Sequence, residues 1–112
     1  MSRETEYFFG VEKKRYLTKG ISSRMPEEYI LLMWQWIDCL VLEKSPDVDY
    51  LQIFTFSVVK DNDKLYQRIT HSQELPEYKE TYQLEAMGEG IAGKVFVIDD
   101  SVQCTMLWDE EY

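Results

Sequence analysis

The sequence has 112 residues, of which 45% are hydrophobic and 14% aromatic, so it can fill one hydrophobic core and is not disordered throughout. Its 12 basic and 21 acidic residues give a formal net charge of −9, which disfavours free nucleic acid and anionic membranes as partners and favours a basic protein surface or simple solubility. Met1 to Glu6 form no apolar signal, and the apolar stretch 29–42 is too short to span a bilayer, so we expect a cytoplasmic protein.

The first third of the chain predicts an arm, a strand and the start of a helix. Residues 1–14 mix charges with aromatic side chains and indicate an N-terminal extension or arm. Residues 15–21 alternate like a short strand, which Gly20 and the serines after it bring to an end. A helix is predicted from Pro26, which the first helical turn tolerates, to about Glu43, ahead of the next proline.

The predicted helix carries an apolar arc wider than the stripe of an ordinary surface helix. Trp34 and Trp36 lie on opposite flanks of this arc. A curved sheet that wraps the helix would explain the arc, and so would a helix face that forms an interface. Apolar residues at helical spacing usually face the interior, so we assign the aromatic residues to the core.

Beyond the helix the hydrophobic pattern changes to a period of two, which indicates strands. The segment 60–64 supplies a turn, because Asp and Asn side chains bond to nearby backbone. The predicted strands are 50–59, 65–72, 79–84, 94–99 and 103–108. Residues 15–112 are therefore expected to form a single α+β domain, with one long helix packed on a curved, mainly antiparallel sheet of about five or six strands.

Three glycines between Gly88 and Gly93 match two nucleotide-binding patterns. The dinucleotide-binding fingerprint needs a helix after the glycines, whereas the residues 95–98 predict a strand. The glycine-rich loop of protein kinases does lie between strands, but 112 residues leave no room for the catalytic lobe. We interpret the glycines as a flexible connection between strands and predict no cofactor.

Residue types that bind metals or act as nucleophiles are scattered along the chain. His71, Cys39 and Cys104 lie far apart and lack the spacing of a zinc site. The run 61–63 starts like a calcium loop but lacks the later glycine and glutamate of such a loop. A Cys104–His71 pair depends on the fold, whereas buried reduced thiols and a hydrogen-bonded structural histidine are the simpler interpretation. We therefore predict no catalytic or metal-binding residue and no enzyme activity.

Two groups of adjacent carboxylates remain. Asp99 and Asp100 lie at the end of a predicted strand, and Asp109, Glu110 and Glu111 precede the last tyrosine. Such runs form turns and solvated tails, present negative charge to a basic partner, or hold magnesium in nucleases. The sequence leaves all three open, and a metal-dependent nuclease that uses Asp99 and Asp100 is the enzymatic alternative.

Several segments of the chain resemble one family of short proteins from Firmicutes and their phages, known as domain of unknown function 960. The matching segments are Arg15–Ile21, Asp49–Phe54, His71–Tyr78, Lys94–Asp100 and Thr105–Tyr112, and residues 1–14 look like an extension. The resemblance implies a Gram-positive bacterial or phage setting. It brings no established activity, so it implies no catalytic residues.

Charge and setting together give the functional hypothesis. We expect a non-enzymatic protein that binds a basic surface of another protein, with an acidic inhibitor of a host nucleic-acid enzyme, such as an anti-CRISPR protein against a CRISPR nuclease, as the specific form. The predicted partner-binding residues are acidic or aromatic: Asp99, Asp100, Asp109, Glu110, Glu111, Tyr112 and Tyr78, with Glu77, Glu80, Glu85 and Glu89 as additions. A homodimer with a housekeeping role is the alternative, because the apolar arc is wide and strand edges are exposed.

Overall fold

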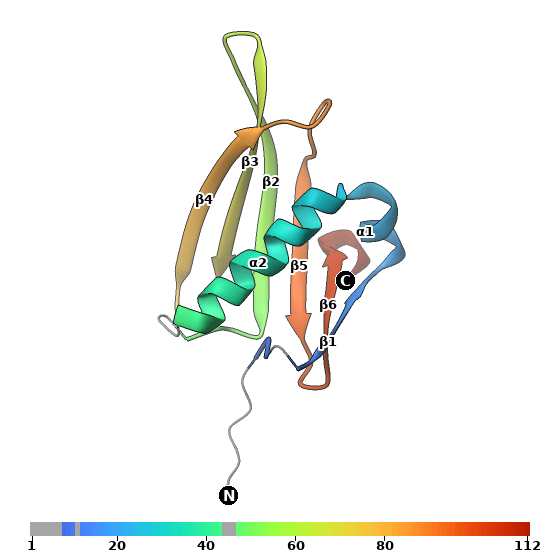
Figure 1. The fold of residues 1–112 in the computed structure, drawn as a ribbon, viewed down its shortest axis with the longest axis vertical. Coiled ribbons are helices and arrows are strands. Elements are labelled where there is room, and N and C mark those ends of the chain that lie inside the picture. Colours follow the sequence, from blue (N-terminus) through green and yellow to red (C-terminus); the bar gives the residue numbers. More distant parts are fainter. Residues whose placement is uncertain (1–7, 11, 44–46) are drawn as a thin grey trace, which may run out of the picture.

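A computed structural model describes residues 8–10, 12–43 and 47–112. In chain order the elements are β1 (Lys14–Leu17), α1 (Lys19–Arg24), α2 (Glu27–Glu43), β2 (Leu51–Asp61), β3 (Lys64–Gln73), β4 (Tyr78–Glu85), β5 (Gly93–Asp99), β6 (Gln103–Trp108) and the 3-10 turn η1 (Asp109–Glu111). The described part is an α+β fold with a six-stranded, mostly antiparallel sheet, as predicted (Figure 1).

The sheet has the strand order β1-β6-β5-β2-β3-β4, and α2 crosses one of its faces (Figure 1). All neighbouring strands are antiparallel except β1, which runs parallel to β6 at one edge. β2 and β5, which carry apolar residues on both faces, lie in the middle of the sheet, where each has a neighbouring strand on both sides. No helix in the described ranges has the length and apolarity that crossing a membrane requires.

The predicted strand 15–21 is wrong in its second half, because β1 ends at Leu17 and helix α1 begins at Lys19. The Thr18 hydroxyl accepts a hydrogen bond from the Ile21 N–H at 3.3 Å, which satisfies one of the free donors at the start of a helix. The Trp108 indole N–H then donates to the Gly20 carbonyl at 3.0 Å and fixes α1 on β6. The Thr18 cap therefore starts a helix where the alternating pattern of residues 15–21 predicted a strand.

Helix α2 follows the predicted bounds, and most of its apolar arc is core. Its buried residues pack on the side chains that the sheet directs toward it, among them Phe54, Phe56, Val95, Val97 and Met106. The two tryptophans do lie on opposite flanks. Trp36 stacks on Tyr82 of β4 with ring centroids 4.0 Å apart, and Trp34 lies on the side of β1 under Arg15.

The described part of the N-terminal arm docks on the domain. Phe9 is fully buried, and its backbone N–H donates to the Asp99 carboxylate at 2.6 Å. Lys13 forms an ion pair with the same carboxylate at 2.9 Å. Residues 1–7 of the predicted arm lie outside the described residues.

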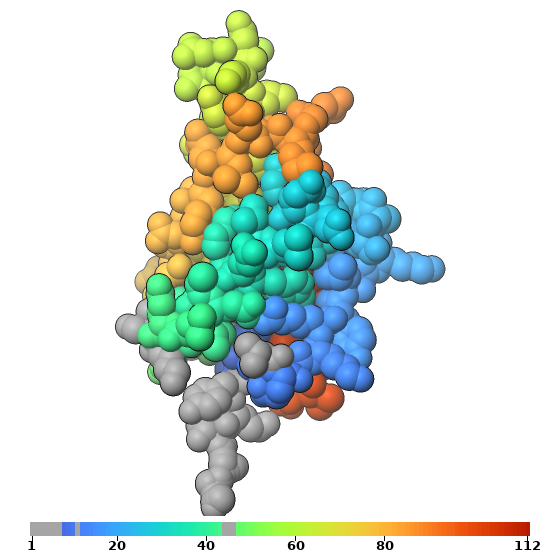
Figure 2. All heavy atoms as spheres, in the orientation of Figure 1, coloured from blue at the N-terminus to red at the C-terminus, as the bar shows by residue number. Residues whose placement is uncertain are grey.

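The turn predicted at 60–64 narrows to Asn62 and Asp63, which both have positive φ, 51° and 66°. Two such residues in succession form the hairpin turn whose twist matches that of the strands. The tip of this β2–β3 hairpin projects beyond the rest of the molecule (Figure 2).

Asp63→Gly is expected to raise the free energy of unfolding by about 0.5 kcal/mol, because glycine adopts positive φ without the steric cost that a side chain carries, and this gain exceeds its entropic cost. Urea denaturation measures the change. Asp63→Ala, which keeps a Cβ and loses the polar side chain that tolerates this conformation, should lower the same quantity. A loss of stability in the glycine variant would contradict the positive φ assigned to Asp63.

Candidate binding groove

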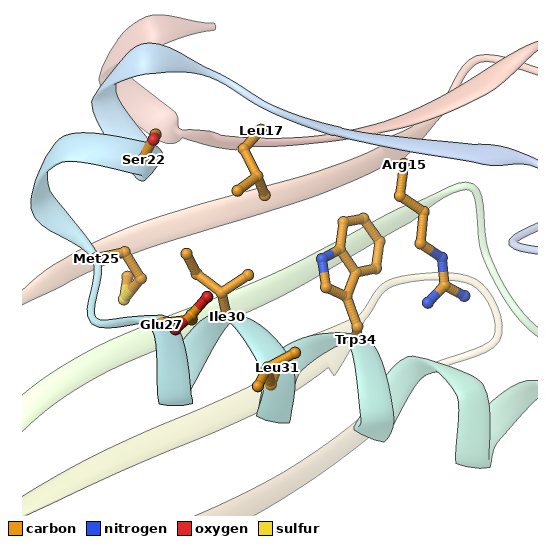
Figure 3. A pocket seen from close by; sticks show the side chains of 8 residues that line it. All are labelled: Arg15, Leu17, Ser22, Met25, Glu27, Ile30, Leu31 and Trp34. Carbon is orange, nitrogen blue, oxygen red and sulfur yellow. The ribbon is translucent and has the colours of Figure 1, made fainter.

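A groove of about 540 Å³ lies between the β1–α1 segment and helix α2 (Figure 3). Eight side chains line it: Arg15, Leu17, Ser22, Met25, Glu27, Ile30, Leu31 and Trp34. Its position follows from α1, which turns the chain back from the sheet edge and leads into α2. The volume falls in the range of pockets that bind small molecules or side chains of a partner.

One flank of the groove is formed by Arg15 and Trp34. The Arg15 guanidinium lies over the Trp34 ring, 4.7 Å from its centroid, and also forms a two-pronged ion pair with Asp38 of α2. Trp34 is only 8% exposed. Ion pairing and stacking hold the guanidinium in place, so this end of the groove is formed before any ligand arrives.

The rim of the groove is apolar and solvent-exposed. Leu17 of β1 is 41% exposed and Leu31 of α2 is 56% exposed. The Thr18 N–H donates to the Met106 carbonyl of β6. Because the backbone groups of successive residues point to alternate sides of a strand, those of Arg15 and Leu17 point to the outer edge of the sheet. A groove with apolar residues on its rim thus lies beside a strand edge that pairs with no other strand in the described part of the chain, which is the combination that strand addition by a peptide uses.

The predicted acidic residues do not gather on one surface. Asp99 and Asp100 lie at one end of β6, whereas Asp109, Glu110 and Glu111 lie at the other, about 20 Å away along a six-residue strand. The second group is turned toward α1: Glu110 pairs with Arg24, and Glu111 accepts bonds from the Thr18 hydroxyl at 2.7 Å and the Trp108 N–H at 2.9 Å. The Trp108 N–H, followed by the Thr18 hydroxyl, lowers the pKa of the Glu111 carboxyl.

Asp99 does not belong to an exposed surface. It is 2% exposed, and its carboxylate accepts bonds from the Phe9 and Ser101 N–H groups and from Lys13. Asp100 is exposed, but its Oδ1 accepts the Val102 and Gln103 N–H groups and closes the β5–β6 turn. These bonds, that of Gln103 first, lower the pKa of the Asp100 carboxyl. The two carboxylates therefore share no open magnesium site.

The two predicted aromatic anchors lie far apart. Tyr112 is 79% exposed and sets its ring edge against Phe96, with centroids 5.7 Å apart. Tyr78 begins β4 at the opposite sheet edge, half-buried against His71. Glu77, Glu80, Glu85 and Glu89 lie on or next to the same edge strand or its following loop.

A family model described as a staphylococcal protein of unknown function, DUF960, matches residues 14–111. The chain belongs to this family. None of the curated proteins matches it. A crystal structure of a protein of unknown function from Enterococcus faecalis has a similar fold, with a TM-score of 0.73 and 24% identity over 93% of this chain and 94% of that chain. The family resemblance is confirmed, and the family description names no activity.

The glycines of this DUF960 chain shape a loop, as predicted. Gly88 and Gly90 have φ of +63° and +83°, a conformation that side chains rarely adopt. The buried Gln67 amide clamps the loop, because its Oε1 accepts the Ile91 N–H and its Nε2 donates to the Ile91 carbonyl, both at 2.8 Å. The Gln67 amide therefore holds the connection between β4 and β5 at Ile91, whereas the sequence predicted a flexible connection.

His71 is a buried structural histidine. Its Nε2 lies 2.6 Å from Gln52 Oε1, while Gln52 Nε2 donates to Gln73 Oε1 at 2.8 Å. The Gln52 oxygen can only accept, so the ring proton is on Nε2. Nδ1 is buried and has no hydrogen-bond partner among the described residues. Burial lowers the pKa of His71 to about 4, which keeps the ring neutral.

His71 and Cys104 do not come together. β5 and β2 lie between Cys104 on β6 and His71 on β3, so the pair that the sequence left open does not form. Burial, and next the Asp99 charge, raises the pKa of the Cys104 thiol to about 11. Cys39 is exposed, not buried as expected. Within the described ranges, no three His, Cys, Asp or Glu residues are placed to hold a metal.

The lining of the groove was missed at the sequence level, although one signal pointed to it. Leu31 intrudes into the polar side of the predicted helix, and it proves to be an exposed rim residue. Arg15 and Leu17 gave no comparable signal, since the groove depends on β1 lying at the sheet edge beside α2.

Proposed function

We propose that this DUF960 chain is a non-enzymatic protein-binding domain that takes an apolar, extended segment of a partner protein. The observation that carries the proposal is the exposure of Leu17 and Leu31 in a groove that Trp34 also lines, beside the outer edge of β1 (Figure 3). Backbone bonds to the edge would supply affinity, and side chains in the groove would supply specificity.

A pair of matched variants tests the proposal, because α2 carries two exposed leucines. Leu31→Lys places a charge on the groove, whereas Leu42→Lys makes the same change outside it, at a residue that is 79% exposed. Tagged chains capture proteins from a Gram-positive host lysate, and mass spectrometry quantifies them. We expect Leu31→Lys to reduce recovery of the partner by about tenfold and Leu42→Lys to leave it unchanged.

Urea denaturation of both variants controls for folding, since surface substitutions usually change stability by less than about 0.5 kcal/mol. Equal recovery with the two variants would refute the groove as the binding site. Recovery of the chain itself alone would favour the homodimer, which light scattering would measure directly.

A second candidate is the acidic inhibitor of a host nucleic-acid enzyme, such as a CRISPR nuclease, which the net charge of −9 favours. The acidic residues on the β4 side, Glu77, Glu80, Glu85 and Glu89, are all exposed. This candidate requires binding that weakens as salt rises. Glutamine at these four positions would then slow association, whereas the groove proposal predicts no change.

A further inference from the structure

The face of the sheet opposite α2, here called the uncovered face because α2 crosses the other one, carries an apolar patch, on which Tyr112 sets its ring edge at Phe96. Successive residues of a strand point to opposite faces of the sheet, and residues paired across neighbouring strands share a face. The residues next in sequence to the α2-facing ones therefore lie on the uncovered face, where the apolar ones form two rows. The rows are Ile53–Phe96–Leu107 and Leu51–Ile98–Thr105–Tyr16. Tyr16 is 43% exposed, Leu51, Ile53, Phe96 and Ile98 are each partly exposed, and Leu107 is buried.

At its strand positions, the uncovered face carries a net charge of opposite sign to that of the chain. Its strand positions include five basic residues, Lys14, Lys64, Arg68, Lys79 and Lys94, and two acidic ones, Asp61 and Glu85. Lys64 pairs with Glu85 at 3.3 Å. Two lysines border the patch, Lys14 beside Tyr16 and Lys94 beside Phe96, and a third, Lys79, lies two strands from Ile53, with Ser72 between them. An apolar centre with a charged rim is the usual anatomy of a protein interface.

The dimensions of the patch fit a helix. It spans mainly β2, β5 and β6, so its outer strands lie about 10 Å apart, close to the diameter of a helix with its side chains. The centre is mostly aliphatic, which suits a leucine-rich helix better than nucleic-acid bases, since bases stack on aromatic rings. On the other face the sheet already holds an amphipathic helix, α2, with acidic residues outside its apolar arc.

We infer that the uncovered face is a docking site for an amphipathic helix of a partner protein whose apolar stripe is flanked by acidic residues. The apolar stripe covers the two rows, and its acidic residues meet Lys14, Lys79 and Lys94. This site is separate from the groove between β1 and α2, so either one can exist without the other.

A synthetic helical peptide of about five turns, with leucine on one stripe and glutamate on both flanks, serves as the probe. A peptide with lysine in place of glutamate and a single-stranded oligothymidine of similar length serve as comparison probes. Fluorescence anisotropy measures affinity, and NMR shifts of the isotope-labelled chain locate the site. The double variant Lys14→Glu/Lys79→Glu tests the rim, and Lys19→Glu/Lys60→Glu changes the same charge away from this face.

The expected result is binding of the glutamate peptide with shifts at Ile53, Phe96 and Ile98. Affinity should fall about tenfold in the rim variant and with added salt, remain unchanged in the control variant, and be far weaker for the lysine peptide. Leu31→Lys in the groove should leave it intact. The inference would be overturned by preferred binding of the oligonucleotide, by shifts confined to the groove, or by equal affinity of the two double variants. Failure of the glutamate peptide to bind a chain whose unfolding curve shows that it is folded would overturn it as well.

Discussion

Replacing Asp99 with alanine is expected to lower the free energy of unfolding by about 3–5 kcal/mol, the cost typical of breaking a buried ion pair by removing one partner. The Asp99 side chain is 0% exposed and that of Lys13 11% exposed, so the variant leaves the ammonium group poorly solvated. It also removes the acceptor of the Phe9 and Ser101 N–H groups, which lie 2.6 and 2.7 Å from the carboxylate. Urea denaturation measures the loss.

A double-mutant cycle with Lys13→Ala separates the two contributions. Removing both groups should cost less than the sum of the single losses, because the interaction between Lys13 and Asp99 is then lost only once. Asp100→Ala, at the exposed neighbour, should cost much less than Asp99→Ala. Equal losses at positions 99 and 100 would show that the ion pair contributes nothing beyond closing the turn.

Acidification from pH 6.5 to pH 4 is expected to lower the free energy of unfolding by about 3 kcal/mol through His71 alone. The pKa of its ring is about 4 in the folded protein, against 6.5 for the unperturbed group. Between these two values the unfolded chain binds a proton that the folded chain does not, so stability falls with pH across this window. Below pH 4 both states are protonated and the contribution of His71 levels off.

Carboxylates also titrate at the lower end of this window, so the measurement has to be a difference. Urea denaturation of the wild type and of His71→Phe across the pH range gives that difference, because phenylalanine keeps a ring against Phe54 and does not titrate. The wild type should lose stability relative to the variant as pH falls, whatever the offset at neutral pH. Parallel profiles for the two proteins would show that His71 is not buried in its neutral form.

The antiparallel part of the fold could be read from the sequence because its signals are local. The alternating residues of β2 to β6 and the Asn-Asp turn each determine structure within one hairpin. The pairing of β1 with β6 has no such local signal, because Lys14 and its parallel partner Gln103 lie far apart in the sequence. α1 was read as strand because its cap, Thr18, also fits an alternating pattern.

The candidate sites were less accessible than the fold because they depend on long-range neighbours. Asp99 and Asp100 look alike in the sequence, yet only Asp99 is buried, and it forms an ion pair with Lys13, 86 residues earlier. The groove at Leu17 and Leu31 exists because an edge strand and a helix lie side by side. The charge on the uncovered face becomes visible only when the strand register shows which lysines share a face with Phe96.

The parallel pairing of β1 with β6 also bears on how the chain folds during synthesis. Ribosomes add roughly 5–20 residues per second, so Lys14 waits roughly 4–18 s for Gln103, its partner 89 residues later. The β2–β3 hairpin can close in microseconds once its strands have left the exit tunnel. During synthesis β2, β3 and β4 can therefore pair while Leu17 and Phe9 still lack their final neighbours, and these two side chains are then accessible to a chaperone that recognises apolar segments.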